Sequence, residues 1–223
     1  MLRFLTTTLA VTVAAACLAG SVWATNLEGE ETYNMLFKNG TLDGIDRSSE
    51  LIYARAVSNA LDDESGDRNT GDIALSFREG QAEMAMLEFR QDGKHRSLGT
   101  FPASVGNPMI MYFYESVVRD MAASAGGSPF YIRNRVKEAL VQSSDVQEGE
   151  AVVDGQTVAT QTVRMFPFEG DPNVDRMKGF GDLELRVTMS EAVPGWYMSL
   201  IAEASGGEVY RSELRFDRLD AAQ

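Results

Sequence analysis

Short segments in which apolar and polar residues alternate dominate the chain, the pattern of strands that bury one face. The clearest segment spans residues 183–189, where Leu, Leu, Val and Met occupy every second position. Residues 73–77 follow the same period, and residues 209–216 place apolar and charged side chains on opposite faces. Pro194-Gly195 and Gly206-Gly207 separate the last three segments of this kind, which predicts an antiparallel meander at the C-terminal end.

The segment 82–90 differs because both faces of its predicted strand are apolar. Met84 and Met86 would lie on one face, and the alternate residues on the other are Ala85, Leu87 and Phe89. A strand that is apolar on both faces is expected to be covered on both faces. Asp92-Gly93, a hairpin turn signal, follows it and predicts a paired returning strand.

The segment 106–142 departs from this β pattern and predicts two capped helices. Asn107 and Pro108 supply a cap and a first helical residue, and Gly126-Gly127 ends the first helix before Ser128-Pro129 starts the second. Apolar residues recur at helical spacing in the first helix and form one stripe, made of Ile110, Phe113, Tyr114, Val117, Val118 and Met121. A short helix is also predicted at residues 30–38, ending before Gly40.

These segments together predict the α+β class. We expect a single curved antiparallel sheet of about eight or nine strands that resembles an open barrel. An N-terminal helix and the helical hairpin 106–142, inserted between two β halves, would pack on this sheet. No boundary divides residues 25–223, which we interpret as one domain. The polar segments 61–71 and 170–181 are predicted to be loops.

The hairpin allows two interpretations. In the first, its apolar stripe is core, and its basic residues pair with acids on the same helices. In the second, the hairpin is a lid over a concave sheet and closes an apolar cavity for a lipid-like ligand. The cavity would be lined by Met84 or Met86 together with residues of the stripe, namely Phe113, Tyr114 or Val117. The basic face of the second helix, with Arg133 and Lys137, is the candidate surface for a protein partner.

The N-terminus predicts export. Arg3 precedes a short apolar run, and small residues precede a cut after Ala24, which together are typical of a secretory signal peptide at residues 1–24. The run is shorter than the roughly 20 residues of a membrane-spanning helix, and we expect no transmembrane segment in the mature chain. The predicted location is the periplasm. The alternative is a lipoprotein anchored through Cys17, although Ala14 stands where such sites usually carry a larger aliphatic residue.

Composition argues against several chemistries. Cys17 is the only cysteine and would leave with the signal peptide, which removes disulfides and thiol nucleophiles. His95 is the only histidine and sits at a predicted turn, so triads and His-based zinc sites are not expected. A net charge of −13 argues against nucleic acid as a partner. No phosphate-binding glycine motif occurs, and we expect no cofactor.

One loop imitates a calcium site. Asp171, Asn173 and Asp175 place oxygen ligands at alternate positions, and Asp182 falls twelfth from Asp171. Arg176 stands where the sharp turn of such a loop requires glycine, and the twelfth residue is the shorter Asp. We therefore favour an ordinary acidic loop and predict no metal.

Four segments carry a resemblance to known proteins: LFKNGTLDGI from Leu36, FPASVGNPMIMYFYE from Phe101, GGSPFYIRNR from Gly126 and VPGWYMSL from Val193. They resemble a group of exported bacterial proteins to which no activity is attached. The order of elements is also similar to the architecture of periplasmic lipoprotein carriers, and it implies a carrier-like fold without fixing a function.

Three functions are consistent with the sequence. The first is a non-catalytic periplasmic protein that binds or carries an apolar, lipid-like ligand between sheet and hairpin. The second is an envelope protein that interacts with other proteins and holds no ligand. The third, a hydrolase, is the least favoured because no nucleophile and base are placed together by any motif.

Overall fold

The computed structural model describes residues 24–78 and 81–221. Most of the predicted signal peptide, with Cys17, therefore lies outside the described residues. The strands, in chain order, are β1 (Ala24–Leu27), β2 (Glu50–Asn59), β3 (Gly71–Arg78), β4 (Gln81–Gln91), β5 (Lys94–Pro102), β6 (Ser144–Val153), β7 (Gln156–Met165), β8 (Glu184–Met189), β9 (Tyr197–Ala204) and β10 (Tyr210–Asp220). The α-helices are α1 (Gly29–Leu36), α2 (Asp63–Asn69), α3 (Met109–Ser124) and α4 (Pro129–Leu140).

All ten strands belong to one sheet, in the order β1-β6-β7-β8-β9-β10-β2-β3-β4-β5. Every neighbouring pair is antiparallel, and β1 and β5 form the two open edges. The predicted α+β class, with an open antiparallel sheet, an N-terminal helix and a later helical pair, is confirmed. The strand not foreseen is β1, which pairs with the start of β6 through Leu27 and Ser144.

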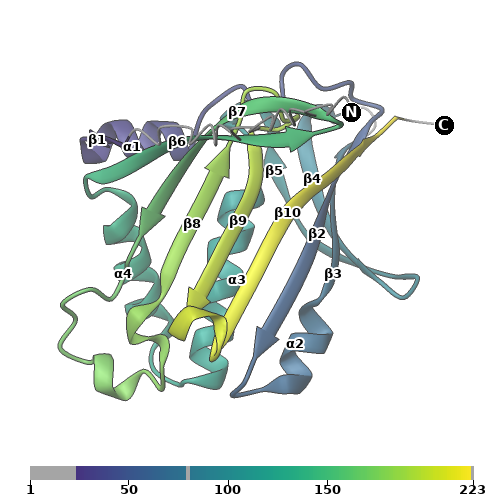
Figure 1. The fold of residues 1–223 in the computed structure, drawn as a ribbon. Helices are drawn as coiled ribbons and strands as arrows, with labels where there is room; N and C mark the ends of the chain where they lie inside the picture. The colour runs from purple at the N-terminus through teal and green to yellow at the C-terminus, as the bar shows by residue number, and fades with distance from the viewer. Residues whose placement is uncertain (1–23, 79–80, 222–223) are drawn as a thin grey trace, which may run out of the picture.

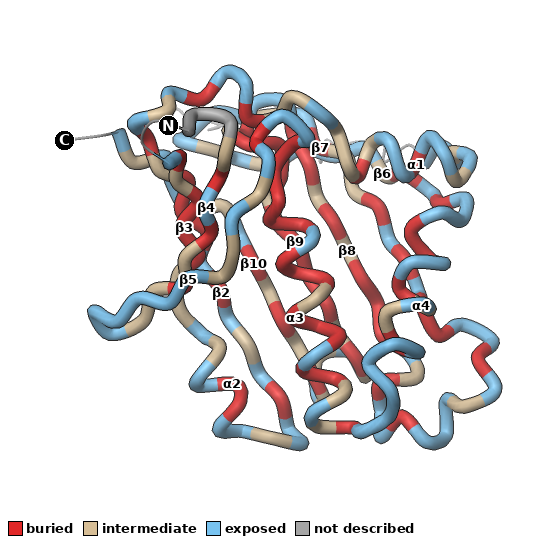
Figure 2. The backbone as a smooth tube through the Cα atoms, turned by 180° about the vertical axis from the view of Figure 1, so that it is seen from behind, coloured by how far each residue is buried: buried red, intermediate tan, exposed pale blue. Residues whose placement is uncertain are grey.

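The helices α3 and α4 lie together on one face of the sheet (Figure 1). Figure 2 shows that α3 runs across the middle of this inner face, over β9 and β10, and that β9 beneath it is mostly buried. The hairpin of β6 and β7 extends across the top of the sheet in Figure 1, close to α1. No helix among the described residues is long and apolar enough to cross a membrane.

The hairpin of helices starts where the sequence predicts it. The side chain of Asn107 accepts a hydrogen bond from the backbone N–H of Met109 (3.0 Å) and so caps α3 from one residue before Pro108. The amide of Asn107 also donates to the carbonyl of Gly195 (2.9 Å) and to the hydroxyl of Tyr53 (3.1 Å). This one buried side chain thereby ties the start of α3 to the β8–β9 turn. A Cβ atom on Gly195 would lie 2.8 Å from the same amide, which leaves room only for glycine.

The acidic segment 61–71 was predicted to be a loop, and this prediction is wrong. It contains α2, which Asp62 caps by accepting a hydrogen bond from the N–H of Ser65 (3.0 Å). Gly66 is buried because the helix approaches β2 so closely that an added Cβ would meet the carbonyl of Val57 at 3.1 Å. A polar helix of two turns has no apolar stripe by which the sequence could predict it. The helix is held instead by the Asp62 cap and by the close contact of Gly66 with β2.

The outer face of the sheet carries a connected row of ion pairs on β7 to β10. Arg164 donates two hydrogen bonds to Glu184 (2.7 and 2.8 Å), and Arg186 bridges Glu184 (2.9 Å) to Glu203 (2.8 Å). The row continues through Arg211, Glu213 and Arg215. The alternate residues of the same strands, such as Val187, are buried on the inner face. Bidentate geometry within a network is the arrangement in which partly exposed ion pairs stabilise a fold.

We expect Glu184→Gln to weaken this row in a pH-dependent way. Hydrogen bonds from Arg164, and then from Arg186, outweigh burial and lower the pKa of Glu184 from 4.5 to about 2. A carboxyl group whose pKa is lowered by folding stabilises the protein above its unfolded pKa and loses that contribution as the pH falls through its folded pKa. The free energy of unfolding in urea should therefore drop by about 2 kcal/mol at neutral pH.

The difference between wild type and Glu184→Gln should shrink as the pH falls from about 5 towards about 2. Glu208→Gln is the control, because Glu208 is exposed and its side chain makes no hydrogen bond or ion pair among the described residues. A Glu184→Gln effect of constant size across this pH range would contradict the assignment.

Candidate functional site

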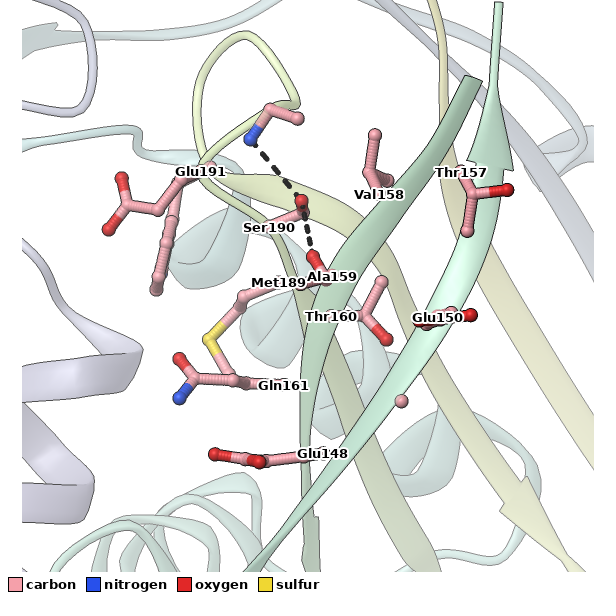
Figure 3. Close-up of a pocket in the computed structure, with 13 residues that line it drawn as sticks. Glu148, Glu150, Thr157, Val158, Ala159, Thr160, Gln161, Met189, Ser190 and Glu191 are labelled. Carbon is pink, nitrogen blue, oxygen red and sulfur yellow. Dashed lines mark hydrogen bonds between the residues drawn. The ribbon is translucent and has the colours of Figure 1, made fainter. Parts of the chain in front are cut away.

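A hollow of about 1120 Å³ lies where the β6–β7 hairpin passes the turn that follows β8 (Figure 3). We call it the strand pocket. Its apolar wall comes from Val158, Ala159, Met189, Ala192 and Trp196, and its acidic residues are Glu148, Glu150 and Glu191. Threonine, serine and glutamine side chains supply the remaining polar surface. Figure 3 shows Glu148, Gln161 and Met189 on the same side of β7, towards α1.

Ser190 holds the turn of the pocket against β7. Its hydroxyl donates to the carbonyl of Ala159 (2.7 Å) and accepts from the N–H of Ala192 (3.2 Å), as drawn in Figure 3. Both partners line the pocket, so the two walls keep a defined spacing. Because the Ser190 hydroxyl is already bonded on both its donor and acceptor sides, we assign it a structural role rather than that of a nucleophile.

Trp196 forms the deep part of the wall and has an unusual backbone. Its φ is +80°, a region that bulky residues rarely adopt, and only 6% of its surface is exposed. The indole N–H donates to the carbonyl of Met35 in α1 (3.1 Å), and the next residue, Tyr197, donates its hydroxyl to the carbonyl of Leu36 (2.6 Å). The β8–β9 turn therefore anchors the C-terminal end of α1 beside the pocket.

Lys38 and Glu191 form an ion pair at the rim. The Lys38 ammonium also lies 4.3 Å from the centre of the Trp196 ring, a cation–π contact. The Glu191 side chain is 78% exposed and that of Lys38 is 39% exposed, so the pair is weak and easily exchanged.

The pocket has a negative electrostatic character. Among the described residues, Glu148 and Glu150 have no ion-pair partner, and both line the pocket from β6. None of the described residues that line the pocket is basic, and Lys38, which pairs with Glu191, lies at its rim. Like charges repel across a low-dielectric wall, so the strand pocket disfavours an anionic ligand.

The residues predicted to line a cavity under the hairpin fall into two separate sets. Phe113 and Val117 expose none of their surface and Tyr114 exposes 5%, all within the core between α3 and the sheet. No water-sized space therefore touches Phe113 or Val117. Met86 is 36% exposed and Met84 is half-buried, on the face of β4 opposite the buried Ala85 and Leu87. The structure does not bring the two methionines together with the helix residues around one space.

The Tyr114 side chain belongs to this packed interior. It is buried without a hydrogen-bond partner among the described residues, and burial raises the pKa of its phenol.

The basic face of α4 is partly neutralised by its surroundings. Arg133 donates two hydrogen bonds to Glu115 on α3 (2.6 and 2.8 Å), which joins the two helices of the hairpin. Arg135 pairs with Glu138 (2.6 Å) and with Asp171 (2.9 Å). Lys137 is exposed, and the structure describes no ion pair for it. Of the basic residues on this face of α4, only Lys137 is therefore exposed without an ion pair among the described residues.

The side chains of the calcium-like loop bind the protein's own donors. Asp171, whose side chain is fully buried, accepts hydrogen bonds from the Tyr131 hydroxyl (2.6 Å) and the N–H of Asn173 (2.8 Å). Burial favours the protonated acid, but these bonds and Arg135 hold the pKa of Asp171 below its ordinary value. Asp182 accepts from the N–H of Ser205 (2.9 Å), and Asp175 is exposed. In the part of the chain that is described, His, Cys, Asp and Glu side chains form no metal-binding group of three.

Sequence reasoning missed the strand pocket. Its residues come from positions 148–161 and 189–196, which no motif connects. The one local signal was the Pro194-Gly195 turn followed directly by Trp196 in a chain with two tryptophans.

Comparison with known proteins leaves the family open. No protein-family model matches the chain, and no curated protein matches it. The crystal structure of lipoprotein LppX from Mycobacterium tuberculosis is similar with a TM-score of 0.36 and 10% sequence identity, over 86% of this chain and 96% of that chain. A likeness this distant assigns neither a family nor a function to the chain.

The packing of the hairpin can be tested with two substitutions. Phe113→Ala should lower the free energy of unfolding by about 3–5 kcal/mol, because the fully buried ring fills the space between α3 and the sheet. Met86→Ala should cost less than about 0.5 kcal/mol, because Met86 lies on the exposed face of β4. Urea unfolding followed by circular dichroism measures both. Equal losses would place Met86 in the same interior as Phe113.

Proposed function

We propose that this chain is a non-catalytic binding protein that holds an apolar or amphipathic small molecule without negative charge in the strand pocket. In this proposal it acts after export, as its N-terminus predicts. The supporting observation is the pocket itself, about 1120 Å³ with two buried apolar side chains, Met189 and Trp196, in its wall. Ligand sites of small molecules usually measure about 300–1,000 Å³ and combine apolar walls with a few polar groups.

The polar groups of the pocket suit recognition rather than chemistry. Glu148 and Glu150 are carboxylates on one strand, and the described residues that line the pocket with them include no Lys, Arg, His or Cys. The only histidine, His95, pairs with Glu88 (2.9 Å) on the β4–β5 hairpin and does not line the pocket. The side chains of Thr157, Thr160 and Gln161 offer hydrogen bonds to a neutral or cationic polar end of the ligand.

The position of the pocket explains how a ligand would enter. The core under α3 is closed around Phe113 and Val117, whereas the hollow lies beyond it at the β6–β7 hairpin. A ligand that enters there needs no movement of α3 or α4. In this proposal the helical hairpin is a fixed cover beside an open site, rather than a lid.

Binding can be measured with N-phenyl-1-naphthylamine, a neutral aromatic probe whose fluorescence rises in apolar surroundings. We expect Val158→Glu to weaken probe binding by about tenfold or more, because it places a third unpaired carboxylate in the wall. Val152→Glu is the matched control. Val152 lies on the same hairpin, is 71% exposed and does not line the strand pocket.

Equal affinities of Val158→Glu and wild type, with both proteins folded by circular dichroism, would overturn the proposal. Native mass spectrometry of the purified protein gives a second readout. The wild type is expected to carry a small molecule that Val158→Glu lacks.

A further inference from the structure

A second, smaller hollow of about 330 Å³ lies between the C-terminal end of α1 and the start of α3. The strand pocket lies on the opposite side of the same end of α1. We call it the α1 notch. Its walls are largely apolar and aromatic, with Phe37, Phe101, Val105, Ile110, Met111 and Tyr197 among them. It shares no residue with the strand pocket, so its ligand is a separate question from the function proposed above.

The notch opens onto exposed apolar surface. Val105 is 61% exposed, Met111 is 48% exposed and Tyr33 is 42% exposed, and all three line it. The Tyr33 ring stacks on Phe37 with centroids 4.6 Å apart, which extends the apolar wall along α1. Exposed apolar side chains that gather around one hollow indicate a binding surface rather than scattered surface residues.

Among the residues that the structure describes, Lys38 is the only charged one that lines the notch. Its ammonium is held at the boundary between the two hollows by the Trp196 ring. An apolar hollow with one cation at its edge is complementary to an apolar molecule that ends in one anion.

The protein itself places a carboxylate on this cation. Glu191 pairs with Lys38 from the strand-pocket side, and its side chain is 78% exposed. An exposed pair of this kind is worth about 0–1 kcal/mol, so a ligand carboxylate that also buries its chain replaces Glu191 at little cost. The released Glu191 returns to water.

We propose that the α1 notch binds the apolar chain of an aliphatic monocarboxylate, with the carboxylate on Lys38 in place of Glu191. The two hollows then have opposite charge preferences, because the carboxylates of the strand pocket repel the ligand that Lys38 attracts.

Decanoate and 1-decanol have the same ten-carbon chain, but only decanoate carries a negative charge. Comparing the two, each below its aggregation limit, therefore separates the contribution of the charge from that of the apolar chain. The protein is the full chain with Trp23→Phe, which leaves Trp196 as the only tryptophan. By isothermal titration calorimetry, decanoate should bind about tenfold more tightly than decanol, the increment of one charge-assisted contact. Trp196 emission should change with decanoate and not with decanol, because only the carboxylate replaces Glu191 as the partner of the ammonium that lies on the ring.

Lys38→Met keeps the aliphatic stem and removes the charge. It should reduce decanoate binding to the level of decanol and leave decanol unchanged. Lys94→Met, at an exposed lysine on β5 outside both hollows, is the control and should alter neither affinity. Glu191→Gln should tighten decanoate binding by about two- to fivefold, because the competing carboxylate is gone. Its exposed position keeps this variant foldable if Lys38→Met is not.

Met111→Ser tests the chain site and should weaken decanoate and decanol together. Val158→Glu, in the strand pocket, should leave decanoate binding unchanged. A failure of the proposal for the α1 notch can therefore be distinguished from a failure of the function proposed for the strand pocket. Equal affinities for decanoate and decanol in wild type would overturn the proposal. So would a Lys38→Met variant that binds decanoate as wild type does, or a Met111→Ser variant that leaves both affinities unchanged.

Discussion

The contact between the apolar stripe of α3 and the inner face of the sheet is the constraint on which the rest of the structure depends. Ten strands in an open sheet leave one broad apolar face to be covered, and Phe113 and Val117 cover its centre without leaving space for water. Asn107 fixes the start of the helix against Gly195 in the β8–β9 turn. With the centre closed in this way, the strand pocket and the α1 notch lie beyond the core, near the end of a helix.

Both hollows lie at such an end, on either side of the last turn of α1. Trp196 and Tyr197 are consecutive residues, yet Trp196 lines the strand pocket and Tyr197 lines the α1 notch, and each donates a hydrogen bond to a carbonyl of α1. The positive φ of Trp196 turns the indole away from the direction that an ordinary strand residue would take. A strained residue that is held by packing at the edge of a pocket is a common feature of binding sites.

The charged residues on the outer face of the sheet and those around α1 have different roles. On the outer face, acids and bases neutralise each other in a connected row, and the row serves stability. Around α1, in contrast, Glu148 and Glu150 have no partner among the described residues, and Lys38 has one that is largely exposed. Residues whose charges are not satisfied by the fold are the ones that a ligand can satisfy.

The sequence by itself determined the α+β class, the antiparallel strands and the helical pair, because periods of two and 3.6 residues are local properties of a chain. It also placed Asn107, Pro129 and the double glycine at the helix ends. It did not determine which face of β4 is core, because both faces are apolar, and only the assembled core puts Leu87 inside and leaves Met86 outside. The strand pocket was decided by the tertiary structure alone. Its walls, residues 148–161 and 189–196, are apart in the sequence and meet only because β7 pairs with β8 and Ser190 bonds to Ala159.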